Sequence, residues 1–365
     1  MIRDWSLCYS PAVSHSTDTG SVKAWLSASI SDPLWDDFLR STPCGQFQQS
    51  SLWAEYKASE GWKHHRVILT DAAGIVGGFQ ILWKQSRLGR MGYVSKGPVL
   101  GLETDENTKA ALDRLRDACR TLGLMALIAQ PPDESRILPS VLQEGRFLPN
   151  KFKDIVRTTL LLDLTSGMKK IESGMSSSAR MEVKQAKRRE AIVREGDTAD
   201  ISIFFGMIEA TCLRQKTKPN PATEENLGAL WALFKPHGAR IMIAQCRGED
   251  VAGQLCIPFG GRVTIWKKGW TGQHRDCHPN RLLIHTGLEW ACAKGLKYWD
   301  YAALDPGIAA SMLAGKPLSD EQKRSRHMFH LGFGGEARLL PESRIWIGNP
   351  LVRLGYRLFS KTVSP

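Results

Sequence analysis

The spacing of apolar residues along the first half of the chain predicts alternating helices and strands. Residues 34–39 and 51–60 carry apolar side chains at helical spacing, with a Pro-Cys-Gly break between them. The β-rich runs RVILTD and GIVGGFQILWK flank Asp-Ala-Ala-Gly, which predicts a hairpin. A strand over GYVSKGPVLG, an amphipathic helix over residues 108–123 and a buried strand over LMALIAQPP complete this series.

The second half of the chain repeats this order. The strand TTLLLDL, a basic helix, the strand VREGD and two apolar helices precede the strands RIMIAQCRGEDVAGQLCIPFGG and RVTIWKKGWTG. A helix over residues 280–295 then leads into the strand KYWDYAAL. This order resembles the plan of a GNAT acyltransferase, found twice in one chain. We therefore expect an α/β (α+β) fold of two tandem GNAT-like domains, with a cleft between or beside them.

These elements divide the chain into four parts. Residues 1–20 are rich in Ser, Thr and Asp and are expected to form a loose tail. The two GNAT-like domains are placed at residues 21–157 and 158–335, and residues 336–365 form a C-terminal segment expected to pack on the first domain. A length of 365 residues, with 42% apolar and 24% charged residues, suits two globular domains.

The net charge indicates a class of partner, and the lack of targeting signals indicates a compartment. A net charge of +12 favours polyanions such as nucleic acid, nucleotide phosphates or an anionic membrane surface. The sequence has no apolar run of the roughly 18 residues that a membrane span needs, and its first residues do not resemble a signal peptide. The expected location is the cytoplasm, with peripheral contact to the inner membrane surface as an addition.

The cysteines indicate the redox environment. All eight are scattered, and none belongs to a C-x-x-C pair. Several lie in apolar runs, where cysteine acts as a small hydrophobic residue. We therefore expect a reducing cytosol and no structural metal.

Five segments resemble motifs of the Fem family, the aminoacyltransferases that add amino acids from aminoacyl-tRNA to the peptide of cell-wall precursors. They are QFQQSSLWAEYK (46–57), SKGPVL (95–100), the strand and basic helix of 158–197, the stretch 279–305 that begins PNRLL, and MFHLGFGGEARLLP (328–341). Each is short, but together and in order they cover most of residues 46–341. The resemblance implies aminoacyl-tRNA as donor and a UDP- or lipid-linked peptidoglycan precursor as acceptor.

Three cations are candidates for binding the phosphates of that acceptor. The resemblance places Lys57 at the phosphate-binding lysine of the family and Arg214 near its second phosphate-binding residue, an arginine. Lys96, beside a Gly-Pro turn, is expected to line the same cleft. A compact ammonium and a planar guanidinium both suit phosphate, so Lys57→Ala and Arg214→Ala are predicted to weaken acceptor binding with little loss of folding. The alternative for each residue is an ordinary exposed side chain.

A basic helix is the candidate binding site for tRNA. Arg180, Lys184, Lys187 and Arg188 stand at i, i+4, i+7 and i+8, which places them on one helix face. Such a face can neutralise several phosphates of an acceptor stem in a salt-sensitive way. No aromatic residue interleaves the stripe, so stacking of single-stranded bases is not predicted. The alternative is a solvated helix face.

Two residues are candidates for catalysis. His330 stands where the resemblance places the lysine of the family's Phe-Lys-x-x-Phe segment, which assists transfer. A histidine can deprotonate an attacking amine at neutral pH, although it does not hold a permanent charge as lysine does. Asp300, at a strand end, can orient an amine or a histidine. The alternatives are a strand cap for His330 and structural ion pairing for Asp300.

The predicted function is aminoacyl or acyl transfer to the amine of a cell-envelope precursor, without a metal or other cofactor. The alternative is a CoA-dependent GNAT N-acyltransferase in envelope or exopolysaccharide synthesis, with a CoA thioester as donor. Against this alternative, the loop HRDCHPNRLL lacks the glycines with which GNAT enzymes hold pyrophosphate at a helix start. A further alternative is a non-catalytic module that binds RNA or an anionic membrane through the basic helix and the C-terminal tail. No stable protein partner is inferred.

Overall fold

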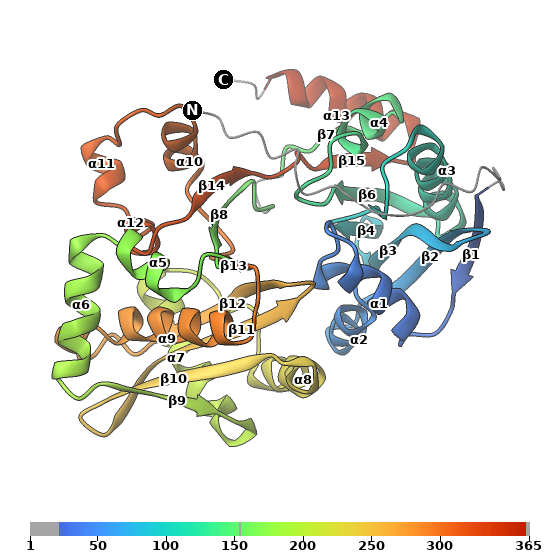
Figure 1. The fold of residues 1–365 in the computed structure, drawn as a ribbon. Coiled ribbons are helices and arrows are strands. Elements are labelled where there is room, and N and C mark those ends of the chain that lie inside the picture. Colours follow the sequence, from blue (N-terminus) through green and yellow to red (C-terminus); the bar gives the residue numbers. More distant parts are fainter. Residues whose placement is uncertain (1–21, 153–154, 363–365) are drawn as a thin grey trace.

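Two mixed β-sheets organise the chain, one in each half (Figure 1). The computed structural model describes residues 22–152 and 155–362, so the tail predicted at residues 1–20 lies outside the described residues. In each half, a meander of three strands is followed by a helix and by a strand that runs parallel to the third strand of the meander. The repeat inferred from the spacing of apolar residues is therefore present.

The first sheet has eight strands in the order β1-β2-β3-β4-β6-β15-β7, with β5 paired to β3. Its strands are β1 (Lys23–Ser27), β2 (Lys63–Asp71), β3 (Gly74–Ser86), β4 (Gly89–Ser95), β5 (Val99–Leu100), β6 (Leu124–Gln130), β7 (Leu148–Pro149) and β15 (Arg344–Ile347). The helical elements of this half are α1 (Pro33–Ser41), η2 (Phe47–Gln49), α2 (Ser51–Ser59), α3 (Asp105–Thr121) and α4 (Leu138–Glu144).

The second sheet has seven strands in the order β14-β8-β13-β12-β11-β10-β9. They are β8 (Thr158–Asp163), β9 (Ile192–Gly196), β10 (Arg240–Cys246), β11 (Glu249–Phe259), β12 (Arg262–Trp270), β13 (Tyr298–Asp300) and β14 (Glu336–Leu339). A bulge interrupts β12, because Cys256 of β11 pairs with Ile265 while Leu255 pairs with Lys267. Trp266 is the extra residue, so the alternation of side chains changes beyond it.

Helices cover both faces of the second sheet. They are α5 (Met168–Gly174), α6 (Ser177–Arg188), η3 (Thr198–Asp200), α7 (Ile201–Gln215), α8 (Glu224–Phe234), η4 (Lys235–His237), η5 (Arg275–Cys277), α9 (Pro279–Ala293), α10 (Pro306–Leu313), α11 (Asp320–Lys323) and α12 (Met328–Leu331). The basic segment expected as one helix forms two, α5 and α6, because Met175 is extended and the Ser176 side chain caps α6.

A hydrophobic core joins the two halves. It holds Phe47 and Trp53 from the first half together with Phe204, Trp231 and Phe234 from α7 and α8. The ring of Phe234 lies edge-on to Phe47 and Trp53, with centroids 6.1 and 6.5 Å away. A second core lies between the opposite face of the second sheet and α9. The α1–α2 region is therefore fixed against the second half by apolar packing.

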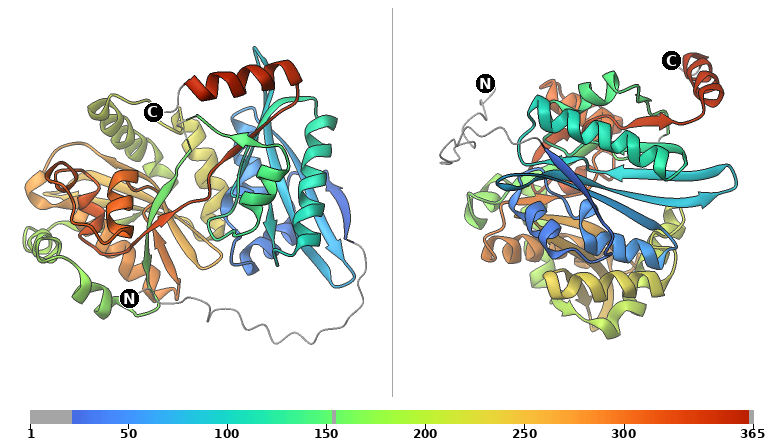
Figure 2. Two further views of the ribbon diagram at one scale, coloured as in Figure 1. Left: turned by 90° about the horizontal axis from the view of Figure 1, so that it is seen from above. Right: turned by 90° about the vertical axis from the view of Figure 1, so that its right-hand side faces the viewer.

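The C-terminal segment divides between the two sheets, whereas the sequence placed it on the first domain alone. β14 pairs with β8 in the second sheet, and β15 lies between β6 and β7 in the first. Helix α13 (Pro350–Thr362) then lies beside the first half (Figure 2), where the Tyr356 hydroxyl donates to the Pro149 carbonyl at 3.1 Å. Among the helices of the described ranges, none has both the length and the apolar character that crossing a bilayer requires.

A disulfide joins Cys246 to Cys277, which the sequence did not predict. The two cysteines are 31 residues apart and stand at the end of β10 and in the loop before α9, with Cα atoms 6.5 Å apart. Because only the tertiary fold brings these two places together, the scattered cysteine pattern gave no sign of the pair. The interpretation of the cysteines as evidence for a reducing compartment does not account for this bond.

Candidate active site

A cleft of about 540 Å³ lies between the two halves and takes its lining from both. Lys57 of α2 and Lys96 at the end of β4 line it from the first half, with Asp133 from the loop after β6. Arg262 of β12 and Asp300 of β13 line it from the second half. Three of the residues singled out in the sequence, Lys57, Lys96 and Asp300, thus share one cavity.

The first two Fem-like segments fit together beside this cleft. The side chain of Gln49 is fully buried. It accepts a hydrogen bond from the backbone N–H of Gln80 at 2.8 Å and donates one to the backbone carbonyl of Ser95 at 2.7 Å. A Cβ on Gly97 would lie 2.8 Å from the Gln49 side-chain amide, so only glycine allows this approach. Ser50 caps α2 by accepting from the backbone of Trp53 at 3.1 Å. The glutamine, serine and glycine of these segments therefore position α2 and the turn that carries Lys96.

Lys57 is not an ordinary solvated lysine. Its side chain is 14% exposed, and its ammonium pairs with Glu60 at 2.5 Å. The same ammonium lies 5.3 Å from the ring centroid of Trp53 and 5.0 Å from that of Tyr56. The aromatic contacts and the carboxylate hold the charge at the cleft wall, where an anionic group can reach it.

Asp133 is the centre of an ion network at the cleft. Its carboxylate accepts from Lys96 Nζ at 2.5 Å, from Arg262 at 2.6 Å and from Gln46 at 2.7 Å. Burial alone would raise the pKa of Asp133, but the Lys96 and Arg262 charges lower that pKa to about 2. Because Arg262 belongs to the second sheet, this network also links the two halves.

Asp300 is buried near the same Arg262 guanidinium nitrogen that binds Asp133. It accepts from Thr159 Oγ1 at 2.5 Å and lies 3.6 Å from the Arg262 guanidinium. Burial raises the pKa of Asp300, and the Arg262 charge and the Thr159 hydrogen bond oppose that rise. The ion pairing named as the alternative for Asp300 is present, and the carboxylate still faces the cleft.

His330 lies apart from the cleft, in a cluster with Lys268 and Tyr301. It belongs to α12 rather than to a strand, so the strand-cap alternative does not apply. Its Nε2 contacts Lys268 Nζ, and its ring stacks on Tyr301 with centroids 5.0 Å apart. The bulge at Trp266 explains how Lys268 reaches His330. Because of the extra residue, the Lys268 side chain lies on the same face of the sheet as Ile265, and Thr264, which lines the cleft, lies on the opposite face.

The cluster around His330 changes the basicity of its members. Burial lowers the pKa of His330 well below its usual value, and the nearby Lys268 charge lowers it further. Burial likewise lowers the pKa of Lys268, to about 8, with help from the Arg326 charge. The imidazole is therefore neutral at neutral pH, and its Nε2 accepts from the Lys268 ammonium.

Arg214 is engaged elsewhere. Its guanidinium donates to the carbonyls of Thr271 at 2.8 Å and Trp270 at 2.5 Å, and it stacks over the Trp270 ring at 5.0 Å. Arg214 is not among the described residues that line the cleft. Its visible role is to hold the end of β12.

The four predicted tRNA-binding residues are exposed on α6, while Ala179, Val183 and Ala186 face the protein. Arg180 donates to the carbonyls of Glu172 and Met175, and Lys187 lies 3.9 Å from Glu289. Arg180, Lys184, Lys187 and Arg188 thus form one solvent-facing basic surface, as their spacing predicted.

Arg262 and Asp133 were missed by reasoning from sequence. They are 129 residues apart, and neither belongs to a recognisable motif. The available signal was weak: a charged residue directly after a buried strand in LIAQPPD, and another directly after the glycine pair in FGGR.

Comparison with known proteins agrees with this architecture. A FemAB family model matches residues 30–139, and an acetyltransferase (GNAT) domain model matches residues 174–307. The lipid II:glycine glycyltransferase of Staphylococcus aureus (strain MRSA252) is 24% identical over 194 residues, which cover 50% of this chain and 46% of that protein. The enzyme of the same name from Staphylococcus saprophyticus is 33% identical over 89 residues, 24% of this chain and 21% of that protein. The chain thus matches about half the length, or less, of these curated relatives.

Solved structures share the fold across nearly the whole chain. A crystal structure of FemX superposes with a TM-score of 0.75 at 15% identity, covering 91% of this chain and 99% of that one. A tandem GNAT protein from the clavulanic acid biosynthesis pathway superposes with a TM-score of 0.51 at 12% identity, covering 90% and 99%. The fold is therefore that of a tandem GNAT protein, which confirms the prediction from sequence. The family matches add that residues 30–139 are similar to the FemAB family and residues 174–307 to GNAT acetyltransferases.

Proposed function

We propose that this protein is an acyltransferase that moves an aminoacyl group from aminoacyl-tRNA to the amine of a UDP- or lipid-linked peptidoglycan precursor. The observation that carries the proposal is the cleft between the two halves, whose walls hold Lys57, Lys96 and Arg262. The glycyltransferase names of its relatives support a cell-wall acceptor. The acceptor's phosphates would bind at these cations, and its peptide would extend toward the second half.

Catalysis would take place at the point where the pairing of β12 with β13 ends. The two strands pair from Arg262 to Thr264, opposite Tyr298 to Asp300, and the pairing ends there. Asp300 faces the cleft, and the next residue, Tyr301, stacks on His330. The amine of the acceptor peptide would reach His330 past this point. Asp300 and Arg262 would hold polar groups of the peptide on the way.

The chemistry needs one base and correct positioning. The acceptor nitrogen attacks the carbonyl carbon of the aminoacyl ester, a C–N bond forms, and the C–O bond to the tRNA ribose breaks. Once the Lys268 ammonium turns from Nε2 to the carbonyl oxygen, neutral His330 would take the proton that the amine loses and return it to the departing ribose oxygen. The Lys268 ammonium beside it would favour negative charge on the carbonyl oxygen. No covalent enzyme intermediate is required.

The donor would lie along α6. Its four exposed cations form a surface that neutralises phosphates, so binding should weaken with salt. Replacing Arg180, Lys184, Lys187 and Arg188 together with alanine should reduce the slope of log affinity against log salt by about 3. An unchanged slope would remove α6 from the proposed donor site.

Helix α13 would bring the protein to the membrane that carries a lipid-linked acceptor. Leu351, Leu354 and Leu358 lie on one face and are 79%, 54% and 59% exposed. Exposed apolar residues on an amphipathic helix with Arg353 and Arg357 suit the surface of an anionic bilayer. This peripheral contact is part of the proposal.

The deciding experiment is transfer of radiolabelled amino acids from a mixed pool of charged tRNA to lipid II or to a UDP-linked muropeptide. Label is expected in the acceptor peptide. The label lost in His330→Ala should exceed any change in His237→Ala, a control at an exposed histidine. Parallel reactions use labelled acetyl-CoA with the same acceptors. No transfer from tRNA to either acceptor would overturn the proposal.

A second candidate is a CoA-dependent N-acyltransferase, favoured by the match of residues 174–307 to the acetyltransferase domain model. The loop before α9, where GNAT enzymes hold pyrophosphate, contains Asp276 and the bulky residues His274 and Cys277 in place of glycines. Arg247 and Arg189 pair with Asp276 at 2.7 and 3.6 Å, so the missing glycines, and not its charge, count against a pyrophosphate there. Transfer from acetyl-CoA alone would nevertheless favour this candidate.

A further inference from the structure

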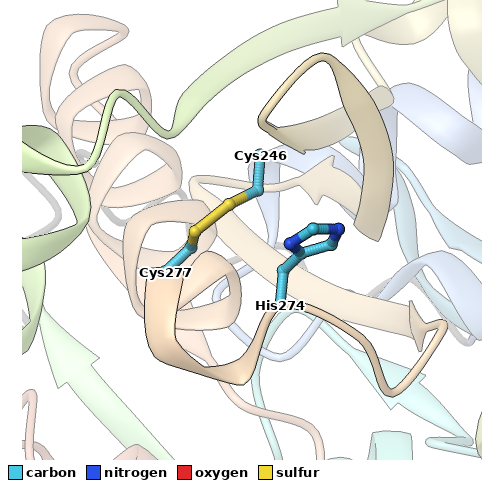
Figure 3. A group of neighbouring side chains, drawn as sticks. All are labelled: Cys246, His274 and Cys277. Carbon is cyan, nitrogen blue, oxygen red and sulfur yellow. A yellow bond between two sulfur atoms is a disulfide. The ribbon is translucent and has the colours of Figure 1, made fainter.

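Two cysteines and a histidine meet at the end of the second sheet. Cys246 ends β10, Cys277 lies in η5, and His274 directly precedes that turn. Their sulfur atoms and one imidazole nitrogen all lie within 4.8 Å of one another. Figure 3 shows the His274 ring turned toward the two sulfurs. None of the three is among the described residues that line the cleft.

The surroundings of His274 leave one ring nitrogen available to a ligand. Nε2 lies 3.0 Å from the Glu249 carboxylate, which can only accept, so the ring proton is on Nε2. Nδ1 then carries the lone pair, and the Arg247 guanidinium approaches it at 3.4 Å. Arg247 also donates to Asp276 at 2.7 Å, which is the stronger contact. A ligand of Nδ1 can therefore replace the weaker contact of Arg247 with His274. A carboxylate that holds the far nitrogen of an imidazole is the usual support of a histidine metal ligand.

Burial and backbone geometry also indicate a built site. Cys246 and Cys277 are fully buried, and the His274 side chain is 17% exposed. His274 and His278 both have left-handed backbone conformations, with φ of 49° and 48°. Such conformations cost of order 1 kcal/mol each in residues other than glycine and persist where surrounding contacts impose them. The loop is thus held to the β10–β11 turn by this cluster.

We propose that Cys246, Cys277 and His274 bind a Zn²⁺ ion when the cysteines are reduced. Two thiolates and one imidazole are preferred zinc ligands, and a water molecule would complete a tetrahedron. A thiol reductant first converts the disulfide to two thiols and is itself oxidised to a disulfide. Zinc then displaces the two thiol protons and forms two Zn–S bonds. The loop before α9 would therefore remain fixed in both redox states, by a covalent bond in one and by the metal in the other.

The test is metal binding by the full chain, which does not depend on transfer activity. Protein reduced with a phosphine and freed of metal by a chelator is titrated with Zn²⁺, and bound metal is measured by elemental analysis. One equivalent per chain is expected for the reduced protein and none for the oxidised protein. Titration with Co²⁺ should give the sulfur-to-cobalt absorption and the intense visible bands of a tetrahedral thiolate site.

Matched variants separate this site from adventitious thiol binding. Cys246→Ser should abolish the Co²⁺ spectrum, while Cys292→Ser, at a partly exposed cysteine outside the cluster, should leave it unchanged. Glu249→Gln keeps all three ligands and should weaken Zn²⁺ binding about 10–100-fold through the imidazole. Sub-stoichiometric zinc in the reduced protein, or equal affinity in wild type and His274→Ala, would overturn the proposal. Glu249 is exposed and His274 is partly buried in a loop, so the Glu249→Gln variant is expected to fold and is the decisive one.

Discussion

The guanidinium of Arg262, on the second sheet, donates a 2.6 Å hydrogen bond to the carboxylate of Asp133 in the first half. Both side chains are nearly buried, with 13% and 10% exposed. Arg262 also lies 3.6 Å from Asp300. One side chain therefore balances two buried carboxylates and connects the two walls of the cleft.

Arg262→Ala should destabilise the protein strongly. Asp133 would keep Lys96, but the buried Asp300 would lose the cation that lies 3.6 Å away, and loss of one partner of a buried ion pair costs about 3–5 kcal/mol. We expect a lower urea midpoint, measured by far-UV circular dichroism. Arg120→Ala, which breaks an exposed pair with Asp117, should cost less than about 1 kcal/mol. Equal effects of the two substitutions would contradict the importance of the buried network.

Asp133 should make stability sensitive to acid. Burial opposes ionisation of this carboxyl, yet Lys96 and Arg262 lower its pKa to about 2 in the folded state. The unfolded value is about 3.9, so the stabilisation is complete above roughly pH 4 and is lost as the pH falls toward 2. Asp133→Asn should be less stable at neutral pH and should lose less stability on acidification. Unfolding midpoints at a series of pH values test this, with Asp117→Asn as the exposed control.

His330 should act as a base whose protonation is controlled by Lys268. His330→Ala is expected to lower kcat about 100-fold or more with little change in the KM of the acceptor. Because burial and the Lys268 charge lower the pKa of His330, activity should persist below the usual titration range of histidine. Lys268→Met removes that charge and should move the acid limb of the kcat/KM profile to higher pH. An acid limb that stays in place would exclude the coupling.

Lys57 and Arg214 should differ in their effect on acceptor binding. Lys57→Ala is expected to weaken binding about 10–100-fold, as for loss of a charged hydrogen bond. Arg214→Ala should have a smaller effect, since its guanidinium binds the carbonyls of Trp270 and Thr271 outside the cleft. Binding of a UDP-linked muropeptide, followed by calorimetry, measures both, with the exposed Lys109→Ala as control. A large loss of muropeptide affinity in both variants would indicate that Arg214 binds the phosphates after all.

The apolar face of α13 should govern binding to vesicles. Leu354→Glu is expected to reduce co-sedimentation with anionic vesicles at least about tenfold, because one buried leucine contributes about 1.5–3 kcal/mol. Leu88→Glu, at an 80% exposed position between β3 and β4, is the matched control. Equal binding of wild type and Leu354→Glu would show that α13 does not contact the bilayer.

The spacing of apolar residues was sufficient to predict most long elements, because each buries one face of its own. The meander, helix and parallel strand of both halves follow from it. Short elements were missed: β14 and β15 have four residues each, too few for a periodic pattern. The five Fem-like segments indicated the family, since several of them carry residues that fix helices and turns, as Gln49 and Gly97 do.

The arrangement of the site was less predictable, because it depends on contacts between distant parts of the chain. Lys57, Lys96 and Asp300 were named from local motifs, and the structure places them in one cleft. Their roles in binding and catalysis stay predictions. Strict alternation along β12 would put Lys268 on the same face as Thr264, but one inserted residue reverses this.

The position of β15 has a consequence for synthesis of the chain. This strand follows the whole second half in sequence, yet it lies between β6 and β7 in the first sheet. While the ribosome is still making the second half, the first sheet therefore lacks an interior strand, and β6 presents unpaired backbone groups at one edge. The first half therefore cannot complete the strand pairing of its sheet during synthesis of its own residues. It does so only after residues 344–347 have been made.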